Sequence, residues 1–127
     1  MKPNHLYPWN FLALDDKLSN YSTARAVVLP IPYEATVSYG AGTRLGPQAI
    51  IAASRQVETY DFDFKGEPCS VGIATLGELE QEASGPEAMM DKIESAASGI
   101  LDDKKFLLSL GGEHSISFPL AKALKSK

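Results

Sequence analysis

Three short apolar runs, separated by segments with helical spacing, constrain the fold of this chain more than any other feature. The runs cover residues 26–31, 71–76 and 106–110, and each has the length and apolar character of a strand that is buried on both faces. Helical signals lie between the runs and after the last one. This alternation, with long connections, predicts an α/β fold with a mainly parallel sheet between two layers of helices.

The expected helices are placed by their start signals and apolar spacing. Gly46-Pro47 opens the first, whose apolar positions are Ala49, Ile50, Ala53 and Val57. The second runs from about Pro86 to Leu101, and its apolar face includes methionines that we interpret as core filler. The third begins within residues 115–119 and is expected to continue to Lys127.

Three strands form only a thin parallel sheet. Parallel strands need helices on both faces and neighbours on both edges, and the sequence stops before it supplies them. We therefore expect residues 1–127 to be the amino-terminal part of a single larger domain whose carboxy-terminal part is absent. A half-covered sheet of this kind should make the isolated chain aggregation-prone or oligomeric.

Composition excludes several classes of function. The formal charge of −4 and pI near 5.1 leave no basic stripe, so nucleic acid is not an expected partner. No apolar stretch approaches the ~20 residues that span a bilayer, so no membrane partner is expected either. The first residues lack the apolar core of a signal peptide. The single cysteine, Cys69, rules out an internal disulfide and is expected to be a packing thiol in a cytoplasmic protein.

The segment Leu110-Gly111-Gly112-Glu113-His114-Ser115 contains the strongest candidate for a binding residue. His114 follows the third strand at its carboxyl end, where ligand sites of open α/β sheets lie. Two glycines before it let the backbone turn sharply and lie close to a bound group. On this pattern alone, His114 is either a ligand or a loop histidine bonded to a backbone carbonyl.

The loop after the first strand is rich in glycine, which raises the possibility of a nucleotide site. Gly40, Gly42 and Gly46 precede a helix, and Asp61 and Asp63 follow about 20 residues later. The glycine spacing differs from the dinucleotide pattern, the loop is long for a phosphate turn, and the acidic pair does not end a buried strand. We therefore interpret Asp61 and Asp63 as part of a polar loop. Arg44 suits either a carboxylate ligand or a structural role at backbone carbonyls.

Several segments together resemble the amino-terminal part of the ureohydrolases, the arginase and agmatinase family. The motif Tyr-Glu-x-Thr-Val-Ser-Tyr-Gly at residues 33–40 is more similar to the agmatinase branch than to the arginases. The resemblance extends over nearly all 127 residues. The segments that carry it are residues 10–12, 27–34, 36–50, 54–61 and 110–116.

The resemblance implies a hydrolase that cleaves the guanidinium group of a linear amidine, most simply agmatine to putrescine and urea. Members use two Mn²⁺ ions bridged by hydroxide, because a divalent pair lowers the pKa of water and orients it. The histidine of the family's Gly-Gly-Asp/Glu-His-Ser pattern is a metal ligand, which places that role on His114, with Gly111, Gly112, Glu113 and Ser115 as its supporting loop. Glu113 is expected either to orient the ligands or to stabilise the turn. The full-length protein is expected to form a homo-oligomer in polyamine biosynthesis.

The sequence also departs from the family. The further metal ligands of ureohydrolases, an Asp-x-His-x-Asp cluster and a later Asp-x-Asp pair, do not occur after His114, and His5 lies far from any ligand position. The catalytic and substrate-binding residues are therefore unknown, and this chain alone is expected neither to hold a manganese pair nor to be active. Guanidinobutyrate, arginine and formimidoylglutamate remain open as substrates. The alternative is a non-catalytic α/β interaction module that pairs with another chain through its sheet edge.

Overall fold

The computed structural model describes residues 6–127. Within this range the strands are β1 (Ala26–Ile31), β2 (Ile73–Thr75) and β3 (Phe106–Gly111), and the α-helices are α1 (Gly46–Ser54), α2 (Pro86–Asp102) and α3 (Ser117–Lys125). Short 3₁₀ turns occur at Phe11–Ala13, Thr43–Leu45, Pro68–Val71 and His114–Ile116. None of the helices in this range has the length and apolar character of a bilayer-spanning segment.

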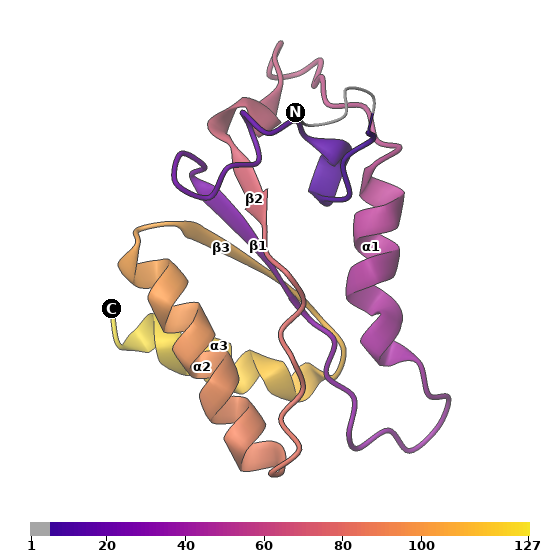
Figure 1. Ribbon diagram of the computed structural model, residues 1–127, viewed down its shortest axis with the longest axis vertical. Helices are drawn as coiled ribbons and strands as arrows, with labels where there is room; N and C mark the ends of the chain where they lie inside the picture. Colours follow the sequence, from indigo (N-terminus) through magenta and orange to yellow (C-terminus); the bar gives the residue numbers. More distant parts are fainter. Residues whose placement is uncertain (1–5) are drawn as a thin grey trace.

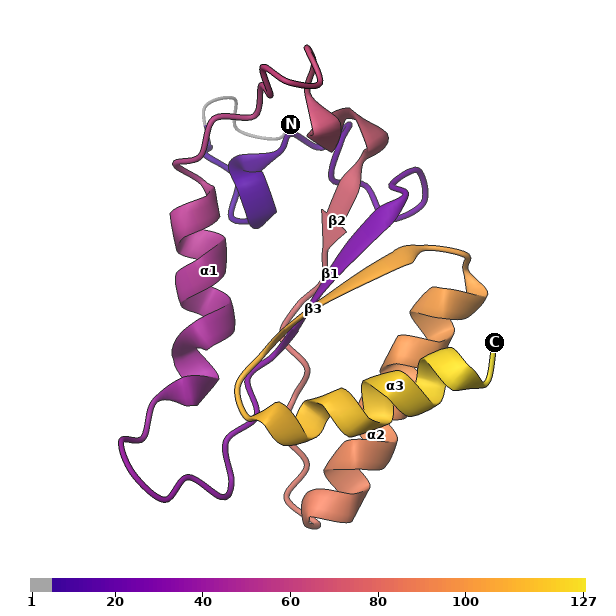
Figure 2. The same ribbon diagram turned by 180° about the vertical axis from the view of Figure 1, so that it is seen from behind.

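The strands form a parallel sheet in the order β2-β1-β3. β1 pairs with β3 over all six residues, from Ala26 opposite Phe106 to Ile31 opposite Gly111. α1 lies on one face of the sheet, and α2 and α3 lie together on the other (Figures 1 and 2). This is the predicted three-layer α/β arrangement with a parallel sheet.

The central core lies between β1 and α2. Val27, Leu29 and Ile31 alternate along β1 toward this side and are almost completely buried. They pack with Met89, Ile93 and Ile100 of α2, which fall on the predicted helix face. The methionine at position 89 is core filler, as predicted. Val28 and Pro30, which point to the opposite face of β1, are also buried.

β2 is shorter than the predicted run of residues 71–76. Val71 belongs to a 3₁₀ turn, and Gly72 has φ of +80°, a left-handed backbone that precedes the strand. At the other end, pairing with β1 stops after Val28 opposite Thr75. Pro30 follows in β1 and has no N–H to donate toward β2, so the parallel ladder cannot continue in regular form.

The predicted apolar face of α1 is wrong. Ala49, Ile50, Ala53 and Val57 are exposed, whereas Pro47, Ile51 and Ser54 face the protein. The buried face is partly polar because the Ser54 hydroxyl accepts a hydrogen bond of 2.9 Å from the Leu12 N–H. That hydroxyl also donates to the Ile51 carbonyl within the helix. Most residues of α1 are apolar, so its sequence is compatible with burial of either face. The Ser54 hydrogen bond to Leu12 favours burial of the face that the apolar spacing did not predict.

The last helix also departs slightly from its prediction. α3 begins at Ser117, within the expected window, but ends at Lys125 instead of continuing to Lys127.

Replacing Gly72 with alanine should destabilise the fold by about 2 to 4 kcal/mol, because a left-handed residue with a side chain is strained and its Cβ is also crowded. The added Cβ would lie 2.9 Å from the Ala24 Cα atom. Urea unfolding of the Gly72→Ala variant should show a lower midpoint with an unchanged slope. The matched control is Gly77→Ala, since no atom lies within 4 Å of a Cβ at that position. Equal midpoints for the two variants would contradict this account.

Candidate functional site

The carboxyl ends of β1 and β3 meet in a backbone contact that only glycine permits. A Cβ at Gly112 would lie 2.1 Å from the Tyr33 carbonyl oxygen. At Gly111 the atom nearest to an added Cβ is the end of the Ile116 side chain, which can move aside. The Gly112 N–H donates to the Ile31 carbonyl at 3.2 Å, and the Glu113 N–H donates to the Tyr33 carbonyl at 2.9 Å. The glycines were expected to allow a sharp turn beside a bound group. In the structure they let the backbone after β3 lie against Tyr33.

Glu113 connects this turn to the loop after β1. Its carboxylate accepts hydrogen bonds from the N–H groups of Ala35 and Thr36, each at 2.6 Å, and from the Thr36 hydroxyl at 2.9 Å. These hydrogen bonds, chiefly the one from the Thr36 N–H, lower the pKa of Glu113 below its ordinary value of 4.5. Of the two roles left open for Glu113, the structure therefore shows a structural one, which extends beyond the turn to a loop some 80 residues away in sequence.

Glu34 holds the far end of the same loop. Its carboxylate accepts hydrogen bonds from the Gly42 N–H at 2.7 Å and the Arg44 N–H at 3.2 Å. It also pairs with the Arg44 guanidinium at 2.9 Å. The Gly42 hydrogen bond is the main cause that lowers the pKa of Glu34. Arg44 therefore has a structural partner within its own loop, and Glu34 occupies the N–H groups that a phosphate would need.

His114 lies at the exposed rim of this edge. It opens the 3₁₀ turn His114–Ile116, and its Nδ1 atom is 3.3 Å from the Ser117 hydroxyl oxygen. Ser115 beside it is also exposed. Mn²⁺ prefers about six nitrogen and oxygen ligands. Residues 6–127 contain no group of three histidine, cysteine or acidic side chains that could hold a metal ion, and the nearby Glu113 carboxylate is occupied by the loop. The described residues thus bring one imidazole, that of His114, to this edge.

The remaining candidates lie elsewhere. Asp61 accepts hydrogen bonds from the N–H groups of Asp63 and Phe64, both at 2.9 Å, within a short polar turn, as predicted. Cys69 is buried, as predicted for a packing thiol, and burial raises its pKa. His5 lies outside the described residues.

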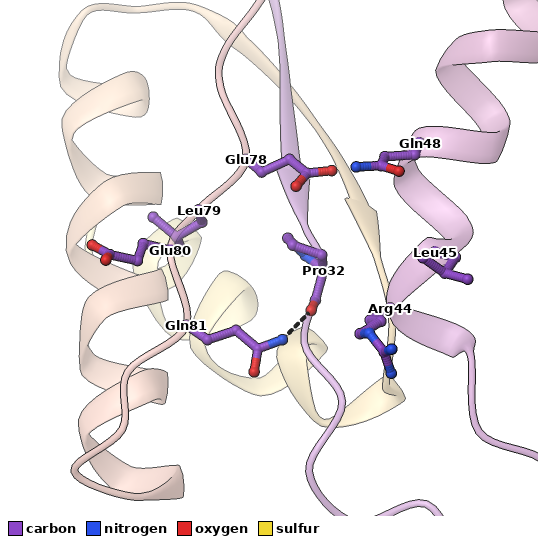
Figure 3. A pocket seen from close by; sticks show the side chains of 8 residues that line it. All are labelled: Pro32, Arg44, Leu45, Gln48, Glu78, Leu79, Glu80 and Gln81. Carbon is purple, nitrogen blue, oxygen red and sulfur yellow. Dashed lines mark hydrogen bonds between the residues drawn. The ribbon is translucent and has the colours of Figure 1, made fainter.

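A pocket that the sequence did not predict lies beside this edge (Figure 3). The Gln81 amide closes part of its wall by donating to the Pro32 carbonyl at 2.7 Å. Glu78 and Gln48 point toward each other across it. His114 does not line the pocket. The segment after β2 has no periodic pattern that would have indicated this position. The lining residues are Pro32, Arg44, Leu45, Gln48, Glu78, Leu79, Glu80 and Gln81.

Replacing Glu113 with glutamine should loosen the loop of residues 34–46 while the sheet stays intact. Glutamine keeps one acceptor oxygen but loses the negative charge and the second acceptor, so the amides of Ala35 and Thr36 should exchange with solvent several-fold faster. Hydrogen exchange followed by NMR measures this directly. Glu87→Gln, at the exposed start of α2, is the control. Unchanged exchange at Ala35 and Thr36 would count against the role assigned to Glu113.

Lowering the pH should weaken the hydrogen bonds that hold the loop of residues 34–46. The pKa values of Glu34 and Glu113 are lowered in the folded chain, so both carboxylates stabilise the fold above their ordinary pKa. This contribution is lost as the pH falls below 4.5 through the lowered values. Amide shifts of Ala35, Thr36 and Gly42 should therefore change together on acidification from pH 6 to pH 3. Shifts that stay constant over that range would refute the assignment.

Comparison with known proteins places these features in a family. Residues 24–127 match the Arginase family. The N(1)-aminopropylagmatine ureohydrolase of Synechocystis is 36% identical over 123 aligned positions, and the match covers 93% of this chain and 40% of that protein. The agmatinase of Halalkalibacterium halodurans is 33% identical over 84% of this chain and 37% of that protein.

Solved structures agree with the sequence comparison. The agmatine ureohydrolase of Thermoplasma volcanium superposes with a TM-score of 0.80 and 31% identity, covering 93% of this chain and 39% of that one. The chain thus spans about 40% of the length of the relatives it matches. Sequence and structure together show that this chain belongs to the arginase family, with ureohydrolases of the agmatinase type among its relatives.

Proposed function

We propose that this chain is the His114-bearing part of a manganese-dependent ureohydrolase that hydrolyses the guanidinium group of an agmatine-like substrate. The observation that carries the proposal is the carboxyl edge of β1 and β3. There Gly112 and Glu113 hold the turn after β3 against the loop after β1. The His114 imidazole is exposed beside this contact. Ligand sites of parallel α/β sheets lie at such edges.

The chemistry of His114 suits a metal ligand. A neutral imidazole is a common nitrogen ligand for divalent cations, and a hydrogen-bonded partner on one ring nitrogen fixes the orientation of the other. The Ser117 hydroxyl oxygen lies 3.3 Å from the His114 Nδ1 atom, within hydrogen-bond distance. Nε2 is therefore the ring nitrogen available to a metal. Bound Mn²⁺ would supply a hydroxide nucleophile at neutral pH. The residues of this chain hold the imidazole and the adjoining loop in place.

The relatives suggest the substrate class. Two of them act, by their names, on agmatine or on N(1)-aminopropylagmatine. Both substrates carry a guanidinium group on an alkyl chain. We therefore propose agmatine, or agmatine extended by an aminopropyl group, as the substrate of the complete enzyme. A cytoplasmic homo-oligomer that acts in polyamine biosynthesis remains part of this proposal.

The same proposal assigns no catalytic activity to residues 1–127 alone. A binuclear site needs several carboxylate and imidazole ligands, and residues 6–127 bring no three such groups together. The further ligands would come from sequence that corresponds to the unmatched part of the relatives. Urea release from agmatine in the presence of Mn²⁺ should therefore be undetectable with this chain.

Manganese titration of the chain tests the assignment of His114. Calorimetry should show no tight stoichiometric site, because a single imidazole binds Mn²⁺ weakly. Paramagnetic Mn²⁺ should nevertheless broaden the His114 ring signals before those of Asp61 and Asp63. The backbone amide signals next to position 114 should broaden together with the ring signals, should lose this broadening in His114→Ala, and should keep it in Ser115→Ala.

Two outcomes would contradict the proposal. A stoichiometric, tight Mn²⁺ site on the isolated chain would show that its ligands are complete. Broadening that centres on Asp61 and Asp63 and leaves His114 unaffected would remove His114 from the metal site.

A further inference from the structure

Two neighbouring cavities lie between α1 and the segment that follows β2. The first is the pocket described above, of about 370 Å³ (Figure 3). The second has a volume of about 280 Å³ and is lined in part by Trp9. Gln48 and Glu78 line both cavities, so the two form one groove. Each cavity is several times larger than the ~30 Å³ that a water molecule occupies in the liquid. The groove therefore has room for a small organic molecule.

The groove lies at the β2 side of the sheet, away from β3. In the strand order β2-β1-β3, its lining residues come from α1, β1, β2 and the segments beside them, and none comes from β3. The chain itself covers the start of the β2 edge, because the Ile73 N–H donates to the Leu18 carbonyl at 2.8 Å. A further strand can join the sheet beside β3, on the opposite side of β1 from the groove. The walls of the groove do not depend on such a strand.

Glu78 carries a charge that has no partner in the described part of the chain. Three charged side chains line the groove. Arg44 pairs with Glu34 at 2.9 Å, and Glu80 lies 3.8 Å from a lysine of α2. Glu78 makes no hydrogen bond or ion pair with another described residue. The Gln48 amide points toward it across the groove (Figure 3). An unpaired carboxylate beside an amide suits a cation that donates N–H hydrogen bonds.

The second cavity provides an apolar wall next to this carboxylate. Pro30, Ile51 and Leu76 line it together with Trp9. The Arg55 guanidinium lies 4.6 Å from the centroid of the Trp9 ring, and the Arg55 Nε donates at 3.0 Å to the carbonyl of the residue before Trp9. Because Arg55 already covers one face of the ring, Trp9 acts here as a fixed apolar wall. A ligand for the whole groove thus has a positive group and a short apolar chain.

We propose that this groove binds a small alkylammonium ion, separately from the edge that carries His114. The ammonium group donates hydrogen bonds to the Glu78 carboxylate and to the Gln48 amide oxygen, and the alkyl chain lies against Trp9 in the second cavity. Glu78 would repel an anion. A divalent metal ion would find one free carboxylate where it needs a set of several oxygen ligands. His114 lines neither cavity.

Titration with butylammonium chloride tests the proposal. Trp9 is the single tryptophan of the chain, so its fluorescence reports on the second cavity. The emission should change saturably, and the side-chain amide signals of Gln48 in NMR spectra should shift with the same midpoint. Butan-1-ol has the same alkyl chain without the charge, and it should show no saturation over the same concentrations.

Variants assign the binding to the groove. Glu78→Gln should weaken it by roughly fivefold, because the variant removes the charge that holds the ammonium group. Gln48→Leu keeps the net charge and should weaken it as well. The matched control is Glu87→Gln at the exposed start of α2, which removes the same charge elsewhere and should leave binding unchanged. His114→Ala should bind like the unaltered chain.

Three outcomes would overturn the proposal. The first is a titration of the unaltered chain without saturation in either signal. The second is equal weakening by Glu78→Gln and Glu87→Gln, which would make the effect one of net charge. The third is loss of binding in His114→Ala, which would move the ammonium ion to the other edge. Far-UV circular dichroism verifies that each variant is folded, as expected for Glu78, which is exposed and has no partner among the described residues.

Discussion

The full-length parallel pairing of β1 with β3 is the constraint on which the rest of this structure depends. Six residues on each strand are in register, and the pairing continues past the strands into the Gly112–Ile31 and Glu113–Tyr33 hydrogen bonds. Residues some 80 positions apart are thereby brought together at one edge of the sheet. The start of α1 joins the same edge, because Gly46 lies close enough that an added Cβ would be 3.1 Å from the Gly111 carbonyl oxygen. A side chain at Gly46 would require this neighbour to shift by a few tenths of an ångström.

Two carboxylates extend this edge into a defined surface. Glu113 binds the first part of the loop after β1, and Glu34 binds its last part together with Arg44. Charge-assisted hydrogen bonds that backbone N–H groups donate to carboxylates are stronger than neutral ones, and such bonds are therefore suited to holding a long loop. The loop tip between these anchors includes Tyr39, which is almost fully exposed. The turn after β3, which carries His114, is thus held by backbone contacts, and the loop after β1 beside it is held at both ends.

The parts of the structure that could be predicted from sequence are those where one signal dominates. β1 and α2 have unbroken apolar patterns, and both lie where those patterns indicate. β2 and the buried face of α1 depend on tertiary details instead: the missing N–H of Pro30, the left-handed Gly72 and the Ser54 hydroxyl. The role of Glu113 could not be predicted, because its partners lie in a distant loop. The His114 assignment came from the family resemblance and remains a prediction.

Close backbone contact at Gly112 assembles the edge that carries His114. Hydrogen exchange of the Gly112→Ala variant measures this most directly, because the Cβ would collide with the Tyr33 carbonyl oxygen. Protection should be lost at the amides of Glu113, Ala35 and Thr36, while the amides of α2 should remain protected. Unchanged protection of Glu113, Ala35 and Thr36 in a folded Gly112→Ala variant would contradict it.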